Sequence, residues 1–311
     1  MPTPPGRLVS IGSHRLHLHC AGEGGPVVVF DAALGASSLS WSLVHPRVAG
    51  ATRACVYDRA GFGWSETGPL PRTAGRIADE LFALLREADV PPPYVLVGHS
   101  FGGLVMRLFA ARHRHDVAGL VLIEPAIPDE WAEPSPQRRA LVERGTRLCA
   151  LGARAARLGV ARLVAGLVRI GALTPARAIT ALISRGGLRR EDEGILAPIW
   201  KLPAEARARL ARAWTQPAFF EALGSQIAHV GDSAVEVQRE AAGSYGDLPL
   251  TVVSARAAAE SRLNADAALA SRSARGRHVL ADDSGHWVPL DAPQVVADAV
   301  LEMVFRLRSS S

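Results

Sequence analysis

A serine flanked by glycines stands between an apolar run and a helical pattern. The segment G-H-S-F-G covers residues 98–102, directly after the apolar run at 94–97. Glycines two positions before and after Ser100 leave room for a sharp turn that exposes the serine at the end of a buried strand. The helix expected from about Phe101 to His113 places its N-terminus there, which favours negative charge. The segment therefore predicts a nucleophilic serine at position 100.

A serine hydroxyl is a weak nucleophile unless a base accepts its proton, and ten histidines compete for that role. His286 lies in D-S-G-H-W at residues 283–287, after the last predicted strand. Loops at that edge are where an open α/β sheet meets its ligands, so we predict His286 as the base. His99 is expected to point along the other side of its turn. Four more histidines are expected at the surface or at a helix end: His17, His19, His113 and His115.

Short apolar runs alternate with helical patterns through the first part of the chain. Continuous apolar runs of this kind are typical of strands buried on both faces of a parallel sheet. Before Pro91, Thr73 is a suitable N-cap and the apolar residues that follow keep the 3.6-residue period of a helix. This order predicts an α/β fold. The expected strands are a hairpin at 9–11 and 16–19 and buried strands at 26–30, 52–57, 94–97 and 117–123.

The pattern becomes helical after Glu124, and strands return only at 250–253 and 278–280. We therefore predict a core domain of residues 1–124 and 248–311, with a helical cap, or lid, inserted at 125–247. One cap helix is expected to carry apolar residues on one face and arginines on the other. This favours a solvated basic face, with peripheral membrane contact through the cap as the alternative. The two sets are Val160, Leu163, Leu167 and Ile170, and Arg154, Arg157, Arg162 and Arg169.

These features together resemble the α/β-hydrolase fold superfamily. The segment D-R-A-G-F-G-W-S at 58–65 resembles the D-R-x-G-x-G-x-S segment of its esterase, lipase and peroxidase-like branches, and S-G-H at 284–286 resembles its terminal G-H. The resemblance implies a mostly parallel sheet with helices on both faces and an inserted cap. It also implies a serine hydrolase that needs no cofactor. The epoxide-hydrolase and haloalkane-dehalogenase branches would require Asp at position 100.

An acidic residue is needed to orient His286, and its identity stays open between several carboxylates. The family usually places the acid after the strand that ends here at Val253, about at Ala258. Glu124 directly follows an apolar strand, 24 residues after Ser100, so its carboxylate should be buried at the same sheet edge and need a partner there. We favour Glu124 as the acid. The alternatives are Glu260, Asp282 and Asp283.

Two backbone N–H groups should form an oxyanion hole. The resemblance assigns one to Phe101, which follows the nucleophile, and the other to Leu34, in A-A-L-G at 32–35. Asp58 and Arg59 are interpreted as a pair that braces the turn after their own strand rather than as catalytic residues.

Composition and charge exclude several classes of function. The 311 residues carry a net charge of +5, and all but Lys201 of the 35 basic residues are Arg. These arginines are scattered without a dense basic run, so we expect no nucleic-acid partner. Aromatic residues of the cap either line a substrate pocket or pack in a core: Trp200, Trp214, Phe219 and Phe220.

The cysteines and the N-terminus predict a cytoplasmic protein. Cys20, Cys55 and Cys149 have neither a disulfide pattern nor zinc-ligand spacing, and we expect buried thiols. The first residues, M-P-T-P-P-G-R, lack a secretory pattern, and no apolar stretch reaches the ~18 residues of a membrane span. No metal site and no stable membrane insertion are expected.

The sequence thus predicts a serine hydrolase that cleaves carboxylic esters of small to medium apolar substrates through an acyl-enzyme on Ser100. Its expected partner is a small-molecule substrate, an ester or related acyl compound; no oligomeric state is predicted. The same residues are compatible with acyl transfer, C–C bond hydrolysis or cofactor-free perhydrolysis. A fold of this kind that binds a small ligand without turnover is the alternative outside catalysis.

Overall fold

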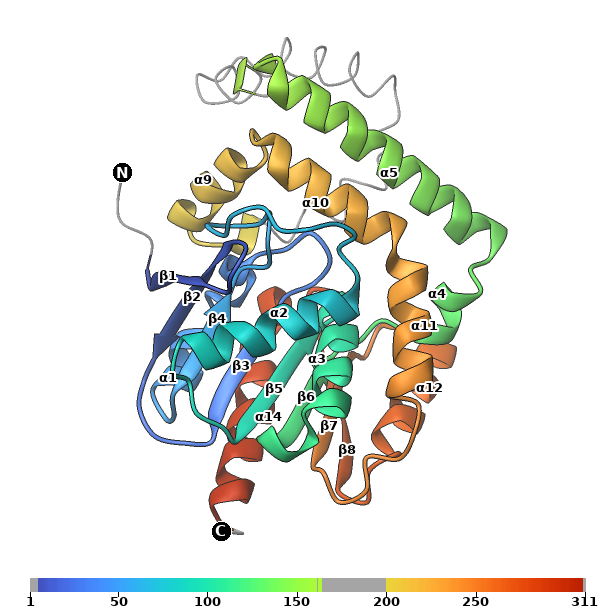
Figure 1. The fold of residues 1–311 in the computed structure, drawn as a ribbon. Helices are drawn as coiled ribbons and strands as arrows, with labels where there is room; N and C mark the ends of the chain where they lie inside the picture. The colour runs from blue at the N-terminus through green and yellow to red at the C-terminus, as the bar shows by residue number, and fades with distance from the viewer. Residues whose placement is uncertain (1–4, 161, 164–199, 310–311) are drawn as a thin grey trace.

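The computed structural model describes residues 5–160, 162–163 and 200–309, and the strands in this part form one mostly parallel sheet (Figure 1). The strand order is β1-β2-β4-β3-β5-β6-β7-β8. β2 pairs antiparallel with β1 and β4, and every later pairing is parallel. This arrangement confirms the predicted fold class. The strands are β1 (Arg7–Ser10), β2 (Arg15–Ala21), β3 (Val27–Asp31), β4 (Ala54–Tyr57), β5 (Tyr94–His99), β6 (Val117–Ile123), β7 (Leu250–Ala255) and β8 (Gly276–Ala281).

Helices cover both faces of the sheet (Figure 1). One hydrophobic cluster joins α2 and α3 to the sheet, and a second joins α1 and α14 to the opposite face. Outside the segment between β6 and β7, the described helices are α1 (His45–Ala49), α2 (Ala74–Glu87), α3 (Phe101–Arg112), α12 (Glu260–Ala270), α13 (Val288–Asp291) and α14 (Pro293–Arg308), with short 3₁₀ turns at Ser38–Trp41 and Arg114–Asp116.

The buried strands have the apolar character that their position requires. Alternate residues of β3 enter different clusters, since Val29 packs with α2 and α3 whereas Phe30 packs with α1 and α14. α2 begins as predicted, because the Thr73 hydroxyl accepts a hydrogen bond from the Arg76 N–H at 3.3 Å. The sequence predicts a final helix that starts at Asp291, but Asp291 ends the separate short helix α13 and Pro293 starts α14.

The described residues between β6 and β7 are helical. α5 packs along α10, and α11 packs against α4, α3 and α2. Figure 1 shows α5 and α10 beyond one end of the sheet. The division into a core and a cap at residues 125–247 stays a prediction. The helices are α4 (Pro128–Ala132), α5 (Pro136–Arg157), α9 (Ala204–Ala213), α10 (Pro217–Ala228) and α11 (Val230–Glu240).

The prediction of one cap helix with an apolar face and a basic face is wrong in the part of the chain that the structure describes. α5 ends at Arg157, and Gly159 follows in the left-handed region at φ 76°, a conformation that commonly ends helices. Arg154 and Arg157 therefore lie on a different segment from Leu163. Leu167, Arg169 and Ile170 lie outside the described residues.

The prediction of three free thiols is wrong for two of them. Cys20 of β2 lies directly opposite Cys55 of β4 in the antiparallel register, and the two form a disulfide. Their Cα atoms are 4.0 Å apart, close to the spacing of a non-hydrogen-bonded pair. Only the strand register brings them together, so their separation along the chain gave no signal. Cys149 is a buried free thiol whose burial raises its pKa to about 11.

His17 was expected at the surface, but its side chain is fully buried. β2 lies between β1 and β4 rather than at the sheet edge. The His17 imidazole Nδ1 lies 2.9 Å from Asp58 Oδ2. Burial lowers the pKa of His17, but the hydrogen bond and charge of Asp58 outweigh burial and leave it above its ordinary value.

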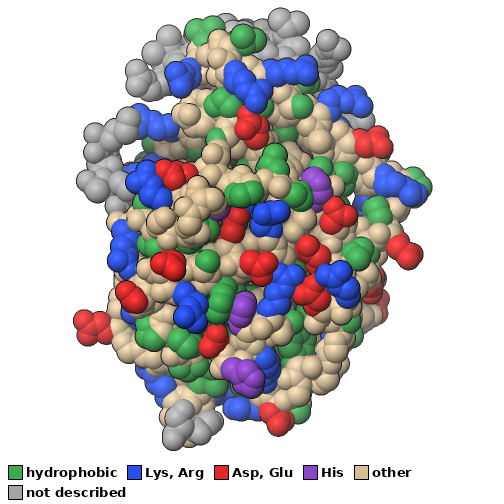
Figure 2. Space-filling view, viewed as in Figure 1, with side chains coloured by type: hydrophobic (Ala, Val, Ile, Leu, Met, Phe, Trp, Pro, Cys, Tyr) green, Lys and Arg blue, Asp and Glu red, His purple; other side chains and the backbone are tan. Residues whose placement is uncertain are grey.

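Charges of both signs are interspersed over the surface. On the face seen in Figure 2, Arg and Lys side chains alternate with Asp and Glu rather than forming one basic patch. Among the described residues, no helix is both long and apolar enough to cross a membrane.

Candidate active site

Ser100 occupies a strained turn between β5 and α3. Its backbone is at φ 54° and ψ −116°, and residues other than glycine rarely adopt a positive φ. A Cβ atom on Gly98 would come within 2.6 Å of the Gly102 carbonyl oxygen, and one on Gly102 within 2.5 Å of the Asp31 carbonyl oxygen. Both glycines are therefore required for this close packing. The turn presents the half-buried Ser100 at the carboxyl end of β5.

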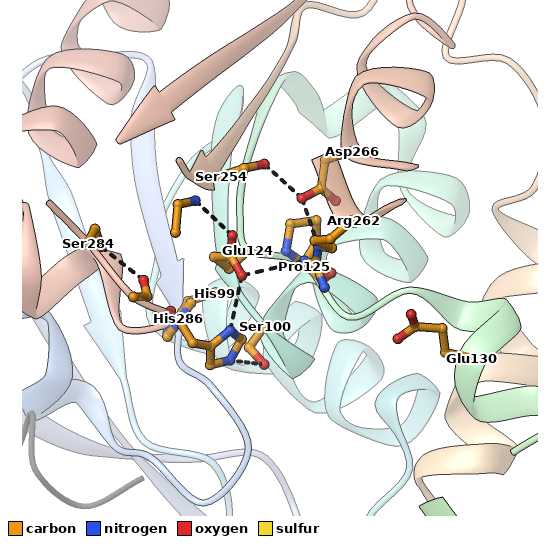
Figure 3. Close-up of polar contacts among 12 residues, drawn as sticks. His99, Ser100, Glu124, Pro125, Glu130, Ser254, Arg262, Asp266, Ser284 and His286 are labelled. Atoms are coloured by element: carbon orange, nitrogen blue, oxygen red, sulfur yellow. Dashed lines mark hydrogen bonds and ion pairs between the residues drawn. The ribbon is translucent and has the colours of Figure 1, made fainter. Parts of the chain in front are cut away.

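His286 lies in the loop between β8 and α13, and its imidazole reaches both neighbours (Figure 3). Nε2 is 3.0 Å from Ser100 Oγ, and Nδ1 is 3.2 Å from Glu124 Oε2. Because a carboxylate only accepts hydrogen bonds, Nδ1 carries the proton and Nε2 is left to accept from the serine hydroxyl. The His286 side chain is 48% exposed, so its orientation depends on these contacts.

The backbone of His286 is held by a second histidine. His99 Nε2–H donates to the His286 carbonyl oxygen at 2.8 Å, and the His99 side chain is fully buried. Burial, with the nearby His286, lowers the pKa of His99 to about 3. His99 is therefore neutral. The sequence predicts that His99 is not the base, but it gives no signal for the hydrogen bond to His286, which lies 187 positions away.

Glu124 is the carboxylate that meets His286. It follows β6 at φ 44° and is 5% exposed. Its Oε1 accepts the Ala255 N–H at 2.8 Å, while Oε2 faces His286. Burial raises the pKa of Glu124, but hydrogen bonds from His286 and Ala255, together with the charge of Arg262, hold it below the ordinary value. Glu124 is therefore ionised at neutral pH.

The other carboxylates considered lie elsewhere. Glu260 is the exposed first residue of α12, and the described structure gives it no contact with His286. Asp282 is exposed and pairs with Arg256. Asp283 is exposed at φ 53°. Of the four carboxylates, only Glu124 lies against His286.

The turn after β3, residues 32–36 (the β3 turn), carries Leu34 and packs beside the start of α3. Arg59, which follows β4, holds this turn. Its guanidinium pairs with Asp31 at 2.8 Å and donates to the carbonyl oxygens of Ala32 and Ala33, the latter at 3.2 Å. The same guanidinium lies 5.1 Å from the centre of the Phe101 ring. Arg59 thus connects the two segments that carry the predicted oxyanion donors.

Asp58 braces the same region in a different way. Its carboxylate accepts the N–H groups of Ser38 at 2.7 Å and Trp64 at 3.1 Å. The expected bracing role is therefore present, but Asp58 and Arg59 bind separate partners. Arg59 ties the turn after β4 to the β3 turn, and Asp58 ties it to Ser38, contacts that the local pattern at 58–65 did not indicate.

Comparison with known proteins agrees with this architecture. Residues 25–162 match the family model described as alpha/beta hydrolase fold. An epoxide hydrolase, CorEH, superposes with a TM-score of 0.69 at 18% identity, covering 96% of this chain and 97% of its own. The chain has the α/β-hydrolase fold. An esterase from Thermogutta terrifontis shares the fold with a TM-score of 0.64 at 21% identity, covering 96% of this chain and 97% of its own.

Curated relatives match only part of the length of this chain. Protein YqjL of Bacillus subtilis is 40% identical over 111 residues, which is 36% of this chain and 44% of YqjL. For the first relatives compared, the match spans less than half of the relative's own length.

α10 packs against two turns beside the candidate site. The Gly35 N–H donates to Gln226 Oε1 at 3.3 Å, and a Cβ on Gly61 would lie 2.4 Å from Ala222 Cβ. α10 therefore contacts both the β3 turn and the turn after β4. Of the aromatic candidates, Phe219 packs edge-to-face against Phe62, with Trp214 and Phe220 around them. Trp200 is 76% exposed.

Within the described residues, no group of three or more His, Cys, Asp or Glu side chains is arranged to hold a metal ion. The polar groups that converge on Ser100 are those of a proton-transfer relay. Such a relay can activate a hydroxyl nucleophile.

Proposed function

We propose that this protein is a serine hydrolase that cleaves carboxylic esters of small to medium apolar substrates. The observation that carries the proposal is the position of His286 between Ser100 Oγ at 3.0 Å and Glu124 Oε2 at 3.2 Å. In this arrangement the base touches the nucleophile with one nitrogen and the orienting acid with the other.

The first half of the reaction forms an acyl-enzyme. Ser100 Oγ attacks the ester carbonyl carbon, and its proton passes to His286 Nε2. The Glu124 carboxylate stabilises the resulting imidazolium. The N–H groups of Phe101 and Leu34 stabilise the tetrahedral oxyanion. When the intermediate collapses, the C–O bond to the alcohol breaks, and the alcohol leaves with the proton from His286.

The second half releases the acid. Water gives a proton to His286 as its oxygen attacks the acyl carbon, and the bond from that carbon to Ser100 Oγ then breaks. The proton returns from His286 to Ser100 as the carboxylic acid leaves. The enzyme is regenerated without a cofactor in this scheme.

The residue at the nucleophile position separates this proposal from the activities named for several fold neighbours. Epoxide-hydrolase and haloalkane-dehalogenase relatives would require an aspartate there, whereas this chain has Ser100. The esterase from Thermogutta terrifontis shows that the same fold occurs with esterase activity. The apolar side chains of α10 near the β3 turn, such as Leu223, support an apolar substrate.

The proposal is tested with a fluorophosphonate probe and p-nitrophenyl esters of increasing chain length. We expect labelling and turnover by the wild type, with kcat/KM highest for short to medium acyl chains. Ser100→Ala should abolish labelling and lower kcat by about 10⁴-fold or more. Ser271→Ala, which removes an exposed hydroxyl after α12, is the matched control and should behave as the wild type. Absence of both labelling and turnover in the folded wild type would sink the proposal.

A further inference from the structure

Arg262 of α12 lies beside the carboxylate that faces His286 (Figure 3). Its Nη2 is 4.0 Å from Glu124 Oε2 and donates to the Pro125 carbonyl oxygen at 2.5 Å. One guanidinium therefore touches the backbone after Glu124 and approaches the oxygen that accepts from His286. Glu124 has a positive φ of 44°, which costs backbone energy unless its surroundings fix it.

Asp266 holds the Arg262 guanidinium on the side away from Glu124. Arg262 Nε donates to Asp266 Oδ2 at 2.8 Å, and the Ser254 hydroxyl donates to the same oxygen at 2.7 Å. Asp266 and Ser254 are buried, and His278 Nε2 lies 2.9 Å from Ser254 Oγ. The planar fork is thus fixed between two buried carboxylates, an arrangement that a flexible point charge does not reproduce as well.

We propose that Arg262 is a positioning residue for the reaction: it fixes the Glu124–Pro125 turn and keeps the Glu124 carboxylate directed at His286. The expected effect of Arg262 on kcat rests on the proposed function, whereas its expected effect on the Glu124 carboxylate does not depend on turnover. The role is unexpected from the sequence, because Arg262 follows β7 near the place where the family usually has its acid. Here that region supplies a cation that supports an acid from β6.

The electrostatic part can be followed through the groups around Arg262. Burial raises the pKa of Glu124, and Arg262 is one of the groups that pull it back down. Burial raises the pKa of Asp266 above its ordinary value, even though Arg262 opposes this. Glu130 of α4 is paired with Arg138 at 2.6 Å. The titratable side chains that Arg262 contacts or acts on are Glu124, Asp266 and His99. His278 and His286 lie one contact further away, and Figure 3 shows Glu130 without a contact to Arg262.

The test compares Arg262→Gln with Arg262→Lys, using Arg277→Gln as the control. Arg277 is an exposed β8 residue paired with Glu302, so its substitution removes one positive charge away from Glu124. In Arg262→Gln we expect the pKa of Glu124, followed by ¹³C NMR of its carboxyl carbon, to rise by about one unit. The acidic limb of the kcat/KM profile should move to higher pH, because loss of the Arg262 charge favours the protonated form of the coupled Glu124–His286 pair. Arg262→Lys should restore most of the pKa, and Arg277→Gln should leave both measurements unchanged.

A folded Arg262→Gln variant with the wild-type pKa of Glu124 would overturn the inference, as would an equal shift in Arg277→Gln. Arg262 is only partly buried, at 19% side-chain exposure, so we expect the variant to fold, and circular dichroism checks this. If Arg262→Gln does not fold, Arg262→Lys decides: a kcat loss of about threefold or more with little change in the pKa of Glu124 supports the positioning role. Wild-type kcat in that variant contradicts it. Because the NMR titration needs no substrate, lack of ester turnover by the wild type would reject the proposed function without affecting this result.

Discussion

Arg59, which supports the β3 turn, lies deep in the core, whereas Arg262, which supports Glu124, is partly exposed. Arg59 and Asp31 are 2% and 1% exposed, while the Arg262 side chain is 19% exposed. Arg59 has an ion pair and two carbonyl acceptors. Arg262 has one close carboxylate, one carbonyl and a more distant Glu124.

This difference follows from the cost of burying charge. A buried ion is tolerated only when nearly all of its hydrogen-bonding groups have partners. Such complete coordination needs several residues in fixed positions, and here they form the contiguous segment at 58–65 and the β3 turn. A partly exposed charge can leave some of its hydrogen bonds to water. Arg262 therefore needs fewer protein partners, which are the Asp266 carboxylate, the Pro125 carbonyl oxygen and the more distant Glu124.

The largest effect is expected from the acid itself. Glu124→Gln keeps the shape of the side chain but removes the charge that orients and stabilises the His286 imidazolium. We expect kcat to fall by about 1,000-fold or more with little change in KM, measured on the best p-nitrophenyl ester. Glu260→Gln is the matched control, since Glu260 is exposed at the start of α12. Loss of kcat in the Glu260 variant alone would reverse the assignment of the acid.

Arg59→Met tests how much the buried Arg59–Asp31 pair contributes to stability. The substitution leaves the Asp31 carboxylate buried without its cation, so we expect a loss of about 3–5 kcal/mol in the free energy of unfolding, measured by urea denaturation. Arg277→Gln, an exposed pair, should change it by less than about 0.5 kcal/mol. Adding Asp31→Asn to Arg59→Met should recover part of the loss. If Arg59→Met and Arg277→Gln had the same free energy of unfolding, burial would not determine how much an ion pair contributes to stability.

The same contrast explains how much the sequence could predict. The strands, the Thr73 cap and the turn at Ser100 are each encoded by neighbouring residues, so local patterns were sufficient for them. His286 was predicted from its position in the loop after the last expected strand, and the family resemblance agreed with that choice. The preference for Glu124 over Glu260 used a local signal too, a carboxylate directly after an apolar strand.

Contacts set by strand register or by packing between distant segments were not predictable. Cys20 and Cys55 meet because β2 and β4 pair in one particular register. His17 is buried because Trp64, Asp58 and the backbone at Pro5 pack around its ring. The role of Arg262 depends on how α12 packs beside the end of β6, and nothing in the residues around position 262 indicates that neighbour.

The smallest effect is expected at His99, which supports the site through geometry rather than charge. His99→Phe retains a buried ring but loses the hydrogen bond to the His286 carbonyl oxygen. We expect kcat to fall by about tenfold, the equivalent of roughly 1.4 kcal/mol for one lost hydrogen bond. His99→Gln, which keeps an N–H donor, should recover part of this loss.

His99 and Arg262 should affect the pH profile of kcat/KM in different ways. Because burial lowers the pKa of His99 to about 3, this side chain is neutral across the working range, and replacing it by a neutral residue changes no charge. The acidic limb of kcat/KM should therefore keep its midpoint in His99→Phe while the plateau falls, whereas in Arg262→Gln the midpoint itself moves. A midpoint that shifts equally in both variants would show that His99 acts electrostatically. His99, which holds the His286 backbone, and Arg262, which holds the Glu124–Pro125 turn, would then no longer differ in how they act.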